Sequence, residues 1–186
     1  MEKDVIARAQ QLATSAHEGQ FRRNAARDPY ITHPQAVAAL VVQSGGKAHE
    51  IASAWLHDVV EDTQVTIDEI REEFGDAIAH IVDGLTDPPH FEGKPIALRK
   101  EWQAQRVVGK NNSIKLVKLA DQLNNIQFVG FDPPTDYSTT DQLDYVEGAR
   151  AIAKNCSGVS AILDTLFEET YQKSVAAIKG RELKDS

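Results

Sequence analysis

Apolar residues recur at intervals of three and four along most of the chain, which is the pattern of amphipathic α-helices. Alternation of β-branched and polar residues, the pattern of a half-buried strand, is almost absent. The spacing predicts helices near residues 3–19, from Pro34 to about Ser44 and from Ala48 to about Asp62. We therefore expect an all-α fold.

Capping and turn residues divide the rest of the chain into further helices. Thr66 with Glu69 forms a capping box, so a helix begins there and ends near Gly75. The segments "TDPPHFEGKP" and "GFDPPTDYS" are loops rich in proline and glycine. The other predicted helices span residues 76–85, 97–108, a segment capped by Ser113 and closed by Gly130, 139–154 and 158–179. This pattern predicts a bundle of about eight to ten helices forming one domain over residues 1–186.

Composition excludes several classes of protein. With 41% hydrophobic and 26% charged residues, the 186-residue chain is typical of a globular domain. Its apolar runs fall far short of the roughly 20 residues that a spanning helix needs, so no membrane association is expected. A net charge of −8 without a long run of Lys and Arg argues against nucleic acid as a partner. The start "MEKD" is not a signal peptide, and the single Cys156 fits a reducing compartment, so we expect a cytoplasmic protein.

The charge is unevenly distributed. "QFRRNAAR" is basic, whereas "HDVVED" is sharply acidic. A small anionic ligand, held between a basic lip and a cation bound by the acids, explains both features. A solvated loop beside a solvated helix end is the simpler explanation.

The stretch "WLHDVVEDTQ" is a costly way to end a helix. His57 and Glu61 lie one turn apart, as do Asp58 and Asp62. Carboxylates so spaced repel each other, and the negative end of the helix dipole disfavours them. A divalent cation reverses that argument, because imidazole and carboxylate groups bind Mn, Fe, Zn or Mg.

Two distant residues are candidates to complete a metal shell. His33 precedes Pro34 at a helix start, where its side chain can point inward or serve only the surface. Asp121 lies on the apolar stripe of a largely buried helix and, with Asn125, is either a buried ligand or a cap for a neighbouring loop. Two His and two Asp residues leave positions for water and substrate, which favours a catalytic site.

Four segments, in this order, resemble the HD superfamily of metal-dependent phosphohydrolases, named after the His-Asp pair. They are "RDPYITHPQAVA", "WLHDVVEDT", "FGDAIAHIVDGLTD" and "IKLVKLADQLNNI". Together they resemble the RelA/SpoT-type hydrolase domain, and the resemblance covers about residues 5 to 130. The remaining residues leave no room for a synthetase portion, so the chain resembles a stand-alone small alarmone hydrolase of the metazoan SpoT-homologue kind.

The resemblance implies an HD-domain helical bundle that uses Mn²⁺ to remove the 3′ pyrophosphate from the nucleotides ppGpp and pppGpp, ending the stringent-response signal. The implied metal ligands are His33, His57, Asp58 and Asp121. The implied catalytic pair that positions and activates the attacking water is Glu61 and Asp62. The implied substrate-binding residues are Arg22, Arg23, Lys94, Asn125 and Tyr145.

The chain departs from this family at the end of one motif, where it has "NNIQ" and many members have "NMR" or "NLR", and at two single positions. Gln122 stands where many members have Arg or Lys, and Asp141 stands where some have a basic residue. Less positive charge should weaken binding of a polyphosphate, so a preference for (p)ppApp stays open. A different HD-family nucleotide phosphohydrolase and a catalytically silent alarmone-binding sensor are compatible with the same motifs. The terminal helices can pack on the domain or on a second subunit, as in a homodimer.

Overall fold

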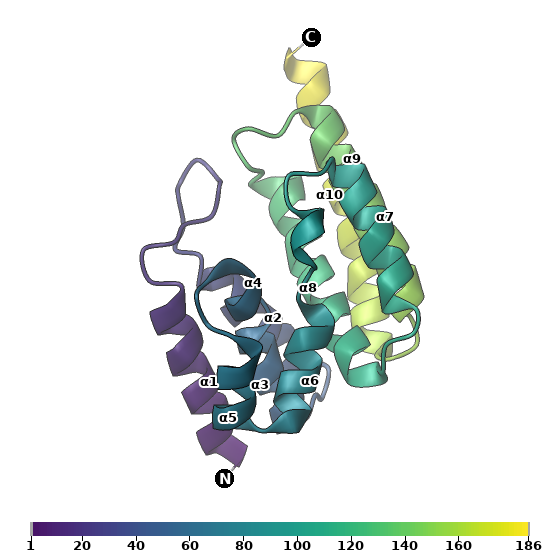
Figure 1. Cartoon of the computed structure of the whole chain (residues 1–186). Helices are drawn as coiled ribbons and strands as arrows, with labels where there is room; N and C mark the ends of the chain where they lie inside the picture. The colour runs from purple at the N-terminus through teal and green to yellow at the C-terminus, as the bar shows by residue number, and fades with distance from the viewer. Residues whose placement is uncertain (1, 186) are drawn as a thin grey trace.

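The computed structural model describes residues 2–185 and folds them into α-helices joined by loops (Figure 1). Within these residues the only β-type pairing is an isolated bridge between Phe21 and Pro29. The predicted all-α fold is confirmed. The elements are α1 (Glu2–Ala16), α2 (Thr32–Gln43), α3 (Ala48–Leu56), α4 (Val59–Asp62), α5 (Ile67–Phe74), α6 (Asp76–Leu85), the 3₁₀ turn η1 (Pro89–Phe91), α7 (Ile96–Val107), α8 (Asn112–Phe131), α9 (Thr139–Cys156) and α10 (Ala161–Asp185).

Helix α8 is the centre of the molecule. It packs against α2, α3 and α6, and also against α9 and α10, while α7 packs on α9. Figure 1 shows α1–α6 gathered on one side of the molecule and α7, α9 and α10 on the other. The fully buried Ile114, Leu119 and Ile126 of α8 join the two groups through one apolar core. A polar residue on α8 can therefore face both groups of helices.

The helix expected from Ala48 to Asp62 is interrupted at the His-Asp pair. Helix α3 ends at Leu56, and the one-turn α4 begins at Val59. The backbone of Asp58 has φ −101° and ψ −6°, in the sparsely populated region where many active-site residues occur. The His57 ring also donates from Nδ1 to the carbonyl oxygen of Ala54 at 2.8 Å. His57 and Asp58 therefore lie at a junction between two helices, and the single-helix prediction is wrong at this point.

The ends of α8 also differ from the prediction. Asn111, not Ser113, caps its start, accepting a hydrogen bond from the Ile114 amide at 3.0 Å. The Ser113 hydroxyl instead donates to Glu50 on α3 at 2.7 Å. Gly130 does not close the helix, which continues to Phe131. A Cβ at position 130 would lie 2.8 Å or less from three atoms of Ser174, so this glycine permits the close approach of α10.

The last two helices, α9 and α10, pack against the rest of their own chain. Both α9 and α10 contact α8, and they contact each other. The capping box of Thr66 and Glu69 and the helix over residues 76–85 are confirmed. Among the helices of residues 2–185, none combines the length and apolar character that crossing a bilayer requires.

Candidate metal centre and active site

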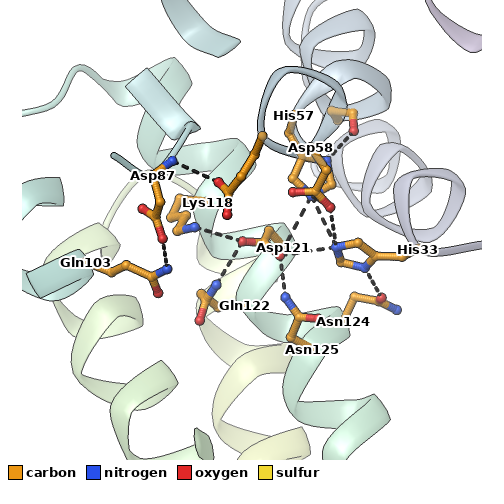
Figure 2. A network of polar contacts seen from close by, with 12 residues as sticks. His33, His57, Asp58, Asp87, Gln103, Lys118, Asp121, Gln122, Asn124 and Asn125 are labelled. Carbon is orange, nitrogen blue, oxygen red and sulfur yellow. Dashed lines mark hydrogen bonds and ion pairs between the residues drawn. The ribbon is translucent and has the colours of Figure 1, made fainter. Parts of the chain in front are cut away.

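Four side chains from three separate segments of the chain converge at α8 (Figure 2). His33 comes from the first turn of α2, His57 and Asp58 from the junction of α3 and α4, and Asp121 from the middle of α8. The Nε2 atoms of the two histidines are 3.1 Å apart. His33 Nε2 lies 3.4 Å from a carboxylate oxygen of each aspartate, and His57 Nε2 lies 3.1 Å from Asp58 and 3.9 Å from Asp121. The structure thus brings together all four predicted ligands.

Hydrogen bonds on the far side of each imidazole fix its orientation. His57 Nδ1 donates to the Ala54 carbonyl, and His33 Nδ1 contacts the side-chain oxygen of Asn124 at 2.7 Å. With protons at both Nδ1 positions, the rings direct their Nε2 atoms at each other and at two carboxylates. Such an arrangement is favourable only with positive charge between the groups, and a carbonyl behind a ligating imidazole is typical of metal sites.

Electrostatics favours the same conclusion. Burial acts to lower the pKa of His57, but the Asp58 carboxylate outweighs it and raises that pKa to about 9. Burial acts to raise the pKa of Asp121, but the Lys118 ammonium, 3.1 Å from Oδ2, holds it well below its usual range. The ligand atoms of His33, His57 and Asp58 all lie within 4.8 Å of one another. Together with Asp121, this mixed nitrogen and oxygen set fits a divalent transition metal such as Mn, Fe or Zn.

The two predicted catalytic carboxylates lie beside this set. Glu61 accepts a hydrogen bond from the Asp87 amide at 2.8 Å, and the main-chain oxygen of Asp62 accepts one from Gln20 at 2.8 Å. Burial, followed by the nearby Asp58 charge, raises the pKa of Glu61 to about 7 and raises that of Asp62. A carboxylate with a pKa near neutrality is well suited to accept a proton from water.

A cavity of about 380 Å³ opens onto the four candidate metal ligands and onto Glu61 and Asp62. Four of the five predicted substrate-binding residues line it, namely Arg22, Arg23, Asn125 and Tyr145. Lys94 is exposed and is not among the lining residues. Besides Arg22 and Arg23, the basic residues that line the cavity are Arg99 and Lys100 of α7 and Lys118 of α8.

The basic lip is held by aromatic rings and by the loop before α9. The guanidinium of Arg22 lies over the Phe128 ring, 3.6 Å from its centroid, and donates to Asn124 at 3.3 Å. Arg23 pairs with Asp136 and lies 5.3 Å from the centroid of the Tyr137 ring. Arg22 and Arg23 are therefore positioned at the cavity before any ligand binds.

Sequence reasoning missed several residues of the site. The Tyr30 hydroxyl donates to Asp58 Oδ2 at 2.7 Å, and Asn124 holds His33. Lys118 lies one turn before Asp121, so its i, i+3 spacing was a usable signal. Lys100 had no such signal, because "LRKEW" resembles a solvated run of charges on a helix.

The two departures have different structural roles. Asp141 belongs to a capping box at the start of α9, where its carboxylate accepts from the amide and hydroxyl of Ser138, and it does not line the cavity. Gln122 is buried beside Asp121, to which its amide donates at 2.8 Å (Figure 2). Only the change at position 122 therefore alters the wall of the cavity.

The comparisons with known proteins agree on one family, that of the HD domain. The family model of the HD domain matches residues 9–145. The guanosine-3′,5′-bis(diphosphate) 3′-pyrophosphohydrolase MESH1 of Xenopus tropicalis is 31% identical over 94% of this chain and 97% of its own length. A probable GTP pyrophosphokinase of Mycobacterium leprae is 38% identical over 70% of this chain, which spans only 16% of that longer protein.

Solved structures show the same architecture. A metazoan orthologue of SpoT, described as hydrolysing ppGpp and acting in starvation responses, superimposes with a TM-score of 0.85 at 26% identity. The match covers 91% of this chain and 94% of that protein. A protein of Listeria monocytogenes EGD-e matches 79% of this chain with a TM-score of 0.62 at 25% identity.

Proposed function

The chain belongs to the HD-domain family and is similar over most of its length to MESH1, and from this premise we propose that it is a metal-dependent alarmone 3′-pyrophosphohydrolase. The proposed reaction converts ppGpp or pppGpp and water into GDP or GTP and pyrophosphate. We further propose that Mn²⁺ is the metal and that the whole chain is one HD-type domain. Its cellular role would be to end the stringent-response signal in the cytoplasm.

One observation carries the proposal: a four-residue ligand set lies directly beside two further carboxylates that the ligand set does not use. His33, His57, Asp58 and Asp121 suffice to hold a cation, whereas Glu61 and Asp62 face the cavity. A purely structural metal site has no need of the additional acids. A silent sensor has no need of a carboxylate whose pKa lies near 7.

The cation, when bound, would supply Lewis-acid polarisation of a phosphoryl oxygen. Glu61 and Asp62 orient a water molecule and accept its proton as the water oxygen bonds to the phosphorus attached to the 3′ oxygen. The bond from that phosphorus to the 3′ oxygen breaks, and the 3′ oxygen takes up a proton to leave as a hydroxyl. The Asp87 amide holds Glu61 in place for this step.

The basic and aromatic residues at the mouth of the cavity are proposed to bind the rest of the nucleotide. Arg22 and Arg23 offer guanidinium groups to phosphates, and Asn125 and Tyr145 lie deeper on the same wall. Lys94 lies on the loop between η1 and α7, outside the residues that line the cavity.

The test is a substrate panel with the purified protein and Mn²⁺. We would incubate it with ppGpp, ppApp and a nucleoside monophosphate, and measure pyrophosphate and orthophosphate separately. Release of pyrophosphate from ppGpp supports the proposal, and a faster release from ppApp would change the base preference. Orthophosphate from the monophosphate alone would assign the protein to another HD-family activity, and binding of ppGpp without any product would make it a sensor.

A further inference from the structure

Two cationic residues of α7 line the cavity without a carboxylate partner. Among residues 4–183, whose side chains the structure describes, no ion pair within 4.0 Å involves Arg99 or Lys100. Two other cations of the cavity are paired, since Lys118 contacts Asp121 at 3.1 Å and Arg23 pairs with Asp136. Arg22 also has no carboxylate partner, but its guanidinium lies over the Phe128 ring. Arg99 and Lys100 therefore bring positive charge to the cavity that no acid of the described chain neutralises at contact distance.

The ammonium group of Lys100 is held in a defined place. Its side chain passes Gly148 of α9, where a Cβ would lie 2.4 Å from Lys100 Cβ and 2.7 Å from Cγ. Its Nζ donates to the side-chain oxygen of Gln122 at 2.8 Å and lies 3.8 Å from the centroid of the Tyr145 ring. The residue is only 5% exposed. This cation is thus built into the wall and is not a solvated lysine.

A buried ammonium group such as that of Lys100 is unfavourable when no carboxylate contacts it. Burying an ammonium without a counter-ion disfavours its charged form, and the pKa of Lys100 is lowered to about 7 by burial and by the nearby Lys118 charge. The Nε of Arg99 is also buried and has no hydrogen-bond partner. An apolar side chain would fill the same space without this penalty. An anion in the cavity would supply a partner to both residues.

We propose that Arg99 and Lys100 form an anion subsite for the outer phosphate of the substrate's 3′ diphosphate. This subsite lets the protein distinguish a diphosphate from a monophosphate. The inference deepens the proposed function and rests on it. Gln122 accepts from Lys100 and donates to Asp121, so a single amide side chain separates this cation from the ligand set. In this proposal one phosphoryl group lies at the ligand set and the next, joined to it by the bridging oxygen, lies at Lys100.

The experiment compares pyrophosphate with orthophosphate as ligands of the Lys100→Met variant, which keeps an unbranched stem and removes the charge. Each anion is titrated calorimetrically into metal-free and Mn²⁺-loaded protein. We expect Lys100→Met to weaken pyrophosphate binding by about 10- to 100-fold and orthophosphate binding by less than about 3-fold, and we expect Lys100→Arg to recover most of the loss. Lys173→Met, an exposed lysine on α10, is the matched control and should bind both anions as the wild type does.

Several results would overturn the subsite. They are wild-type protein that binds no pyrophosphate, a Lys100→Met variant that binds it as tightly as the wild type, and an equal loss for the two anions. If Lys100→Met does not fold, Arg99→Gln takes its place, and an unchanged pyrophosphate affinity in that variant counts against the proposal. Because binding is measured without turnover, a subsite that binds pyrophosphate in a protein that cannot hydrolyse ppGpp or ppApp would contradict the proposed function alone.

Discussion

At the scale of single residues, Asp58 and Glu61 are three positions apart but have different surroundings. Asp58 touches both histidines, whereas Glu61 touches the Asp87 amide and faces the cavity. We therefore expect Asp58→Asn to lose both the bound metal and turnover. Glu61→Gln should bind the metal normally and lose about 10²- to 10⁴-fold in kcat. Metal content of the purified variants and steady-state kinetics measure the two effects, and an unchanged kcat in Glu61→Gln would show that its role is misassigned.

Lys100 gives a pH dependence of stability that can be measured without substrate. Its folded-state pKa is lowered to about 7, whereas an unfolded lysine titrates near 10.5. Between these values the unfolded chain binds more protons, so the free energy of unfolding rises with pH, by at most about 1.4 kcal/mol per pH unit for one group. Below pH 7 both states are protonated and the contribution is constant.

Urea denaturation of metal-free wild type and Lys100→Met from pH 6 to 10 tests this expectation. The difference between the two free energies of unfolding should be flat below about pH 7 and should change in favour of the wild type above it. Parallel curves over the whole range would mean that Lys100 titrates in the folded protein as it does in the unfolded chain.

The site residues differ in how well the sequence predicts them. Asp121 was predictable because a carboxylate within the apolar stripe of a helix conflicts with burial unless it has a partner. Asn124 and Tyr30 were not, since their roles depend on the distance to His33 and Asp58 across the fold. Lys100 is the extreme case, because its burial results from the close packing of α7 on α9 at Gly148.

At the scale of elements, the turn after α6 connects α7 to Glu61 of the proposed catalytic pair. Arg106 on α7 binds the Asp87 carboxylate at 3.2 Å and donates to the Thr86 carbonyl oxygen at 2.8 Å, and the Asp87 amide in turn holds Glu61. Arg106→Ala should lower kcat by about 10-fold while KM changes by less than about 2-fold, because the turn that orients Glu61 loses its anchor.

Steady-state kinetics separates that effect from a general loss of stability. Arg106→Lys should recover part of kcat, because one ammonium can replace only one of the two contacts. The matched control is Arg150→Ala, which removes an ion pair with Glu168 away from the cavity. If Arg106→Ala keeps the wild-type kcat, or if it raises KM alone, Arg106 does not position Glu61.

Helices α8 and α10 provide a second prediction at this scale. Gly130→Ala would place a Cβ 2.4 Å from Ser174 Oγ and 2.8 Å from Ser174 Cα, so we expect it to lower the free energy of unfolding by about 1 to 3 kcal/mol. Gly180→Ala is the matched control, since nothing lies within 4 Å of the added atom, and it should stabilise the protein by up to about 1 kcal/mol. Equal effects of the two substitutions in chemical denaturation would contradict the close approach.

Helix boundaries were predictable where local chemistry sets them and not where the tertiary structure does. The capping box at Thr66 and the helix over residues 76–85 follow from nearby residues alone. The interruption at His57 and Asp58 could not be predicted, because the apolar spacing continues across it. Gly130 was interpreted as a helix stop, because nothing in the local sequence shows that it packs against Ser174 of α10.

At the scale of the whole molecule, the proposed ligand set joins segments that are far apart in the chain. α2 contributes His33, the junction of α3 and α4 contributes His57 and Asp58, and α8 contributes Asp121. The unfolded chain does not hold these residues together, so a bound cation should stabilise the fold by mass action. The gain is about 2.7 kcal/mol at a free-metal concentration of 100 times Kd. For a chain of this size, that corresponds to roughly 5 to 10 °C in Tm.

We therefore expect the Tm of the purified protein to fall by several degrees when the metal is removed with a chelator and to recover when Mn²⁺ is added. The increment should grow with the logarithm of the Mn²⁺ concentration, because stabilisation by a ligand that binds only the native state follows that dependence. Asp58→Asn should show no increment, whereas Glu61→Gln should show the wild-type increment, since Glu61 is outside the ligand set. A Tm of the wild type that is independent of Mn²⁺ would contradict a metal site that spans α2, α3, α4 and α8.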